Sequence, residues 1–193
     1  MLFRSAQQFS LDDMVSKYVT LYRALDVDAP SVLHVGLETL EHRIGGLNRY
    51  LTSLDSALLR TGGCSSSHTV AVGPSSTPTV TAVSGATWWH RWRDIRREVS
   101  RSSAAVIDVH FPAHIAWALV TRAIRDRPLV VHFQGPWSLE SRWTGDARLV
   151  AWCKKRLEGY VLRRADAVVV LSRAFRDIRS EEHTSELQSH LNL

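Results

Sequence analysis

Hydrophobic and polar positions follow two different spacings along the chain, and each spacing predicts one kind of element. Short runs rich in β-branched apolar residues predict strands buried on both faces, whereas apolar residues three or four positions apart predict amphipathic helices. The predicted strands cover 31–36, 68–73, 79–83, 104–110, 129–134 and 166–171. The predicted helices cover 9–25, 47–60, 88–99, 112–125 and 147–164.

Strands and helices alternate from residue 31 to residue 178. This order is typical of an α/β domain with a doubly wound, mostly parallel, Rossmann-like sheet. Ligands of such sheets bind beyond the carboxyl ends of the strands, so the residues that follow each strand are the candidate site. A chain of 193 residues accommodates one such domain with appendages, but not two.

Gly45 and Gly46 stand just before the helix predicted at 47–60. Glycine lets a ligand approach the backbone, and a helix N-terminus offers N–H groups to a phosphate. The same pair is compatible with a turn that needs a positive φ. The pair is not part of a G-x-G-x-x-G fingerprint, so the sequence does not favour a nicotinamide dinucleotide.

His110 ends the strand predicted at 104–110, and His114 follows four residues later. We assign no metal to this pair, because Pro112 separates the two histidines and no acidic helix motif accompanies them. His110 is predicted either to contact a polar substrate or to bond a neighbouring loop carbonyl.

The strand at 129–134 contains His132 and ends at Gln134, which Gly135 and Trp137 follow. We expect a tight turn here that presents backbone groups and one amide to a cleft. Trp137 either stacks on a sugar ring or belongs to the core. Ser172, after the last strand, is predicted to be a helix N-cap.

The charge of the chain narrows the classes of partner. Twenty-four Lys and Arg against 19 Asp and Glu give a net charge of +5, which favours an anionic partner. Residues 88–101 combine three tryptophans with five arginines. We favour a core-facing stripe with a solvated basic face there; the alternative is a face that meets anionic lipid. Nucleic acid is not predicted, since the chain has neither a recognition helix nor an aromatic single-strand motif.

The cysteines and the hydropathy of the chain indicate the cellular compartment of the protein. The two cysteines form neither a disulfide framework nor a metal-ligand pattern. No apolar run approaches the length that spans a bilayer, and the N-terminus has no signal-peptide layout. We therefore expect a cytoplasmic protein, with peripheral contact at the inner face of the membrane left open.

Four segments taken in order resemble the N-terminal domain of a family 4 glycosyltransferase, a retaining enzyme of the GT-B architecture. They are IGGLNRYLTSLDSALL, AAVIDVHF, PLVVHFQGPW and LEGYVLRRADAVVVLSRAF. The resemblance covers residues 31–178 and implies the acceptor-side domain of a hexosyltransferase-type parent enzyme. It implies a nucleotide-sugar donor, which is a substrate and not a cofactor, and a carbohydrate or lipid-linked acceptor. No cofactor is expected.

The resemblance also implies roles for single residues. Gly45 and Gly46 would lie near the donor diphosphate, and His110 would face the acceptor. The family often has His-Gly where this chain has Gln134 and Gly135, and that histidine helps to hold the transferred sugar. Glutamine keeps a donor and an acceptor but carries no titratable proton. His132 would lie on the same side of the strand as Gln134.

The two ends of the chain differ from this domain. Residues 1–30 resemble the last helix of the same family, as the tail of an upstream enzyme would, or form an ordinary helix that covers the sheet. Residues 179–189 match a translated sequencing-adapter oligonucleotide, so we expect 179–193 to be an artefactual, disordered tail.

From these features we expect an inactive, truncated piece of a glycosyltransferase. The alternatives are a non-catalytic α/β ligand-binding module and a basic protein that binds membrane surfaces.

Overall fold

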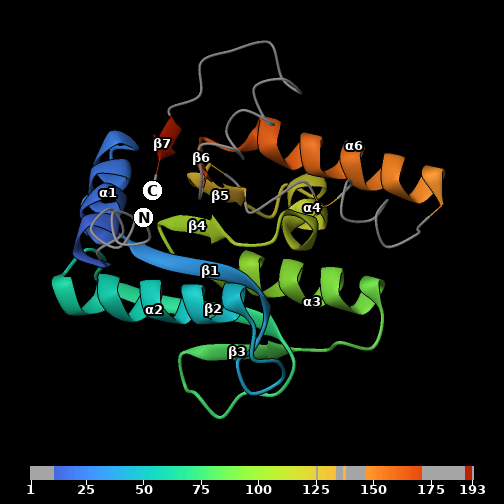
Figure 1. The fold of residues 1–193 in the computed structure, drawn as a ribbon, viewed down its shortest axis with the longest axis horizontal. Helices are drawn as coiled ribbons and strands as arrows, with labels where there is room; N and C mark the ends of the chain where they lie inside the picture. The colour runs from blue at the N-terminus through green and yellow to red at the C-terminus, as the bar shows by residue number, and fades with distance from the viewer. Residues whose placement is uncertain (1–10, 125, 134–136, 138–146, 171–189, 193) are drawn as a thin grey trace, which may run out of the picture.

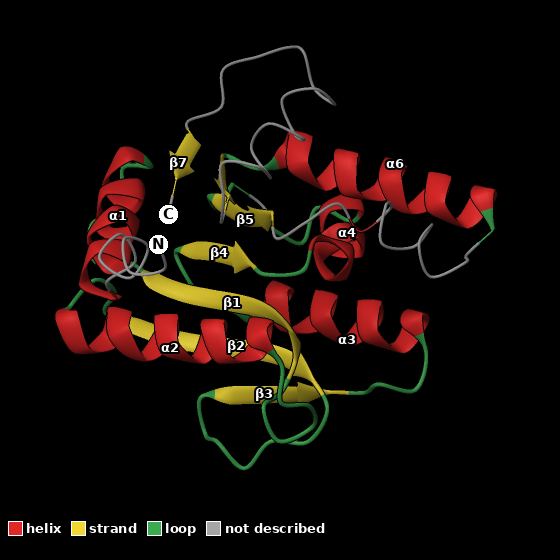
Figure 2. Ribbon diagram, viewed as in Figure 1, coloured by secondary structure: helices red, strands yellow, loops and turns green. Residues whose placement is uncertain are grey.

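The computed structural model describes residues 11–124, 126–133, 137, 147–170 and 190–192. Within them the chain forms a sheet between two layers of helices (Figure 1, Figure 2). The strand order is β3-β2-β1-β4-β5-β6-β7, and each strand runs parallel to its neighbours. The predicted doubly wound, Rossmann-like α/β fold is therefore confirmed.

The strands are β1 Ser31–Glu38, β2 Ser66–Val72, β3 Val80–Val83, β4 Val106–Val109, β5 Leu129–Phe133, β6 Ala167–Val170 and β7 His190–Asn192. The helices are α1 Leu11–Ala24, α2 Gly46–Thr61, α3 Trp88–Arg101, α4 Pro112–Val120 and α6 Arg148–Arg164. Every helix and strand predicted above is present, with ends that shift by a few residues.

The largest shift is at the end of α4, which was predicted to reach residue 125 and stops at Val120. Arg122 takes a positive φ of 54°, and the amide of Ala123 bonds back to the carbonyl of Ala118 at 2.8 Å. This closure resembles the left-handed turn that ends many helices. Ala123 and Ile124 look helical in the sequence because both are apolar, but they are buried in the turn against the core.

The two faces of the sheet are covered by different helices. Contacts between neighbouring helices join α1 to α2 on one side, and α3 to α4 and α4 to α6 on the other (Figure 2). Side chains alternate between the faces along each strand. We call the face under α1 and α2 the front and the face under α3, α4 and α6 the back.

The N-terminal helix α1 packs its apolar stripe on the front of the sheet. Val15, Tyr18 and Leu21 are buried in one cluster with Val32 and Val130 from the strands below. The predicted helix and its buried stripe are confirmed here. Whether the segment is the tail of an upstream enzyme stays a prediction.

Of the tail expected at 179–193, the structure describes only the short strand β7. β7 pairs in parallel with β6, and whether 179–193 is an artefactual tail stays a prediction. The open edge of β6 offers unpaired backbone groups, and a short extended segment satisfies them whatever its side chains. Ser172 lies outside the described residues.

Among the helices described, none combines the length and the apolar character needed to cross a bilayer.

Candidate functional site

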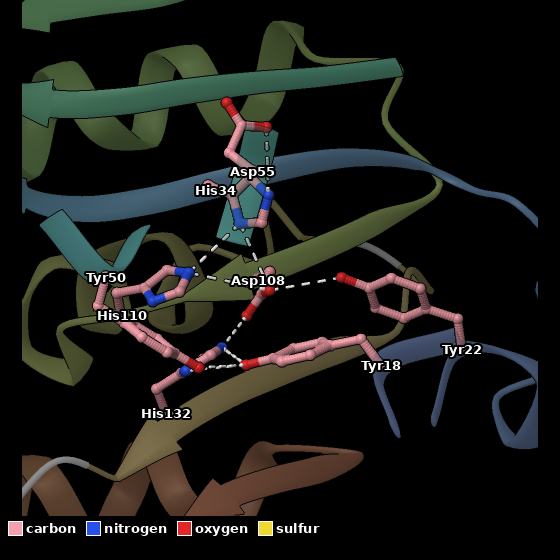
Figure 3. Close-up of polar contacts among 8 residues, drawn as sticks. All are labelled: Tyr18, Tyr22, His34, Tyr50, Asp55, Asp108, His110 and His132. Atoms are coloured by element: carbon pink, nitrogen blue, oxygen red, sulfur yellow. Dashed lines mark hydrogen bonds and ion pairs between the residues drawn. The ribbon is translucent and has the colours of Figure 1, made fainter. Parts of the chain in front are cut away.

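A cluster of polar side chains is buried at the centre of the front face (Figure 3). His34 on β1 and Asp108 on β4 are direct partners in the parallel ladder. His110 follows Asp108 by two residues and therefore points to the same side. His132 projects from the neighbouring strand β5. The register of three adjacent strands thus brings three histidines around one carboxylate.

Asp108 is the centre of the cluster. His132 Nε2 lies 2.7 Å from Asp108 Oδ1. His34 Nδ1 lies 3.4 Å from Asp108 Oδ2, and the hydroxyl of Tyr22 donates to the same oxygen at 3.5 Å. The carboxylate is completely buried, so these contacts replace its hydration.

Two tyrosines from the helices close the cluster over the sheet. The Tyr18 hydroxyl of α1 lies 2.9 Å from the Tyr50 hydroxyl of α2 and 3.1 Å from His132 Nε2. The rings of Tyr18 and His132 are stacked, with centroids 5.7 Å apart. The rings of His110 and His132 are closer still, at 3.8 Å. Hydrogen bonds and ring contacts therefore link α1, α2 and the sheet.

Burial and neighbouring charge set the protonation of the cluster. Burial tends to raise the pKa of Asp108, but His132 and His110 outweigh it, and the pKa falls well below its usual range. Burial also lowers the pKa of His110 and raises the pKa of Tyr18. At neutral pH Asp108 is thus ionised, His110 is neutral and Tyr18 keeps its proton.

The glycine pair lies at the carboxyl edge of the sheet, where α2 begins. Gly45 is the N-cap residue, with an extended backbone at φ −135° and ψ 161°. Gly46 has no positive φ either, so the turn explanation for this pair is wrong. A Cβ at Gly46 would meet no atom within 4 Å, and one at Gly45 would meet only Asn48 Nδ2 at 3.9 Å. Neither backbone conformation nor packing requires glycine at these positions.

His110 lies at the end of β4, as predicted, but its ring faces the cluster. The ring is 3 % exposed, and Nε2 lies 3.3 Å from His34 Nδ1. A backbone carbonyl was the alternative partner predicted for His110. In the structure such a carbonyl is instead the partner of His114, whose Nδ1 lies 2.9 Å from Gly36 O. His132 is fully buried and contacts Asp108 and Tyr18. Both histidines therefore contact protein groups in this arrangement.

Gln134 and Gly135 lie outside the described residues. Trp137 is described and belongs to an aromatic group at the carboxyl ends of β4 and β5. Its ring centroid lies 5.3 Å from that of Phe111 and 5.9 Å from that of Trp88, and Lys154 Nζ lies over its face at 4.9 Å. Trp137 is partly exposed, so it is not a core residue.

His34, Asp108 and the tyrosines of this cluster were not predicted from the sequence. A signal for two of them was present: His34 and Asp108 are polar residues inside otherwise apolar strands. Such interruptions are costly unless the buried group is paired, so they mark polar clusters. The tyrosines gave no signal, because on an amphipathic helix they look like ordinary core residues.

The helix predicted over the basic, tryptophan-rich run is α3. Ile95 and Val99 are buried as the core stripe predicts, whereas Trp88 and Trp89 are 42 % and 54 % exposed. Trp92 is partly buried, and its indole N–H donates to the carbonyl of Ala113 at 2.7 Å. The predicted core-facing stripe is therefore present only in the second half of α3.

The chain matches a known protein family. The family model for Glycosyltransferase Family 4 matches residues 44–182, which is more than half of the chain. No curated protein matches the chain.

Proposed function

Because the chain belongs to the family 4 glycosyltransferases, we propose that this domain is the acceptor-side half of a GT-B enzyme. The enzyme would move a hexose from a nucleotide-sugar donor to a carbohydrate or lipid-linked acceptor and retain the anomeric configuration. The observation that carries the proposal is the glycine pair at the start of α2, within the matched region.

The donor diphosphate would lie against Gly45 and Gly46. The N-terminus of α2 directs free N–H groups and the positive end of the helix dipole at this point. The first turn of α2 has no acidic residue, and Gly45 provides no side-chain cap. The open space around Gly46 leaves room for a diphosphate to approach the backbone.

A charge substitution at the start of α2 tests this placement. Gly46→Asp adds a negative charge that stabilises the helix N-terminus but repels a diphosphate. We expect saturation-transfer NMR to detect binding of UDP-glucose, UDP-N-acetylglucosamine or GDP-mannose to the chain, weakened by roughly tenfold in this variant.

The matched control is Ser56→Asp, which adds the same charge at an exposed position near the middle of α2. It should bind as the unsubstituted chain does. Equal binding by both variants, or no binding of any of the three nucleotide sugars, would refute the diphosphate site.

The acceptor would lie along the aromatic group that follows β4 and β5. Phe111 and Trp137 are partly exposed there, and the aromatic faces suit the apolar faces of sugar rings. His110 and His132 would support this edge from beneath through their ring contact. Gln134 and Gly135, next in the chain after β5, would complete it.

We expect no sugar transfer by this domain alone. In the GT-B architecture the donor is held between two α/β domains, and the described residues form one sheet. Incubation of the purified chain with radiolabelled nucleotide sugars and a glycan or lipid acceptor checks this. Labelled product in such a reaction would contradict the expectation.

A second candidate function is attachment to an anionic membrane surface, and the structure adds an observation in its favour. Helix α6, in the same back layer as α3, exposes Leu149, Val150 and Trp152. A hollow of about 340 Å³ beside Trp152 is lined by the basic residues Lys155, Arg156 and Arg163 together with the acidic Glu158. Exposed apolar side chains next to cations suit the surface of the cytoplasmic leaflet, which carries anionic lipid.

Sedimentation with phosphatidylglycerol vesicles tests this attachment. The double substitution Lys155→Glu and Arg156→Glu should reduce the bound fraction several-fold, and salt should do the same. Arg49→Glu with Arg60→Glu makes the same change of net charge on exposed positions of α2 and should leave binding intact. Equal losses in both double variants, or equal binding to phosphatidylcholine, would rule out a defined α6 surface.

A further inference from the structure

We propose that His34, Asp108 and His110 bind a zinc ion beneath α1 and α2, which ties β1 to β4. The ion would lie in the interior of the domain, and one of its ligands, His110, is also a residue that we place beneath the acceptor edge. Each of the three residues offers one ligand atom, and these atoms all lie within 4.8 Å of one another.

The backbone register brings the three ligands together. His34 and Asp108 are partners across the β1–β4 pair, and His110 stands two residues beyond Asp108 on the same side. All three side chains are at most 3 % exposed, so the packed front layer holds them in place. The cluster therefore differs from a chance group of surface histidines and carboxylates.

Two of the three distances between the ligand atoms match those of a tetrahedral ion, and the third is longer. His34 Nδ1 lies 3.3 Å from His110 Nε2 and 3.4 Å from Asp108 Oδ2, and the third side of the triangle measures 3.9 Å. Zinc bonds of about 2.0–2.2 Å place neighbouring tetrahedral ligands roughly 3.3–3.5 Å apart. Two imidazoles, one carboxylate and a water molecule are a ligand set that suits zinc.

Polar side chains next to the ligands contact their outer atoms, as in zinc sites. His132 Nε2 lies 2.7 Å from the other oxygen of Asp108. His34 Nε2 faces Asp55 Oδ1 at 3.9 Å, and both of these buried atoms have no hydrogen-bond partner (Figure 3). Coordination through Nδ1 places the ring proton of His34 on Nε2, which points at Asp55. The ring proton of the ligating histidine would thus face a carboxylate, as in many zinc sites.

The ion would also satisfy the inner atoms of the cluster. His34 Nδ1, His110 Nε2 and Asp108 Oδ2 lie 3.3–3.9 Å from one another, and hydrogen bonding between them needs a proton on at least one of the nitrogens. A divalent cation would instead accept a lone pair from each of the three atoms. The negative charges of Asp108 and the nearby Asp55 would offset its charge.

The test measures metal in the full chain, produced with an affinity tag that contains no histidine. The chain is unfolded, stripped with EDTA and refolded with or without one equivalent of zinc. We expect about one zinc per chain after desalting, and a thermal midpoint several degrees higher in the zinc-refolded sample. Refolding with Co²⁺ should give the intense visible absorption of a tetrahedral cobalt complex.

The variant pair His110→Asn and His114→Asn locates the ion. The two histidines are similarly buried, but His114 lies outside the cluster against Gly36 O. His110→Asn should retain less than a tenth of the zinc, whereas His114→Asn should retain all of it. Equal retention by the two variants would assign the metal elsewhere. If His110→Asn does not fold, the cobalt spectrum of the unsubstituted chain decides: an octahedral spectrum or no bound metal overturns the proposal.

Discussion

The two faces of this sheet are built from the same strands, but the front adds a buried polar network to its apolar cluster. On the back, residues such as Ile107, Val109 and Val131 form one continuous apolar cluster under α3, α4 and α6. On the front, residues adjacent to them in the sequence include Asp108 and His132, which form a polar network with tyrosines of α1 and α2. A shift of one position along a strand separates the two environments.

The helices on the two faces of the sheet are therefore stabilised by different interactions. Apolar burial is non-directional, so the back helices gain free energy from any close packing. The front network requires hydrogen-bond geometry as well, and each member leaves others unsatisfied when it is removed. We therefore expect the front to be less tolerant of single substitutions than the back.

The largest effect should come from Asp108→Ala, because it leaves a buried His132 ring nitrogen and the Tyr22 hydroxyl without their acceptor. We expect a loss of about 4 kcal/mol of unfolding free energy, measured by urea denaturation with a chelator present. Ile107→Ala, one residue away on the back, should cost about 3 kcal/mol through a cavity. A smaller loss for Asp108→Ala than for Ile107→Ala would remove the proposed difference between the faces.

The next largest effect on the free energy of unfolding should come from the protonation of His114, a buried residue of α4 in the back layer. Burial lowers the pKa of His114 to about 4, with Arg91 acting in the same direction and the bond to Gly36 O opposing it. The unfolded chain takes up this proton near pH 6.5, so stability is full above that pH and is lost as the pH falls toward 4.

Between pH 7 and pH 4.5 this titration should cost about 2–3 kcal/mol. The free energy of unfolding of His114→Asn, which has no titratable ring, should fall by that much less over the same interval. Parallel pH profiles for the two chains would show that His114 does not titrate as its burial indicates.

A smaller effect is expected from Tyr18→Phe, which removes the hydroxyl that joins Tyr50 to His132. The ring and its packing stay, so the loss should be about 1–2 kcal/mol by urea denaturation. Tyr22→Phe serves as the comparison, because its contact with Asp108 is longer, at 3.5 Å, and should contribute less. A larger loss for Tyr22→Phe would reverse the order of the two tyrosines.

The smallest effects distinguish the two ends of α2. Gly62 ends the helix with φ 71°, so Gly62→Ala should cost about 1 kcal/mol through backbone strain. Gly46→Ala at the start has an ordinary φ and open space, so its stability should change by less than about 0.5 kcal/mol. Thermal denaturation measures both, and a marked loss for Gly46→Ala would show that glycine there serves the fold and not a ligand.

Much of the fold could be predicted because it depends on local patterns. The β-branched runs that became β1, β4, β5 and β6 are recognisable without a structure, since strands buried on both faces must be apolar throughout. The front cluster could be predicted only in part. His110 and His132 attracted attention by their places at or near strand ends, but the direction of their rings depends on partners from three other elements.

The sequence alone determined the alternation of strands and helices, the parallel sheet and the family that its ordered segments resemble. Only the tertiary structure decided that His34 lies opposite Asp108, and that Gly45 and Gly46 stand in open space. The physical reason is that periodicity is a property of neighbouring residues, whereas strand register and helix packing join residues far apart in the chain. Tyr18 and His132 are 114 positions apart, and no local pattern records that they meet.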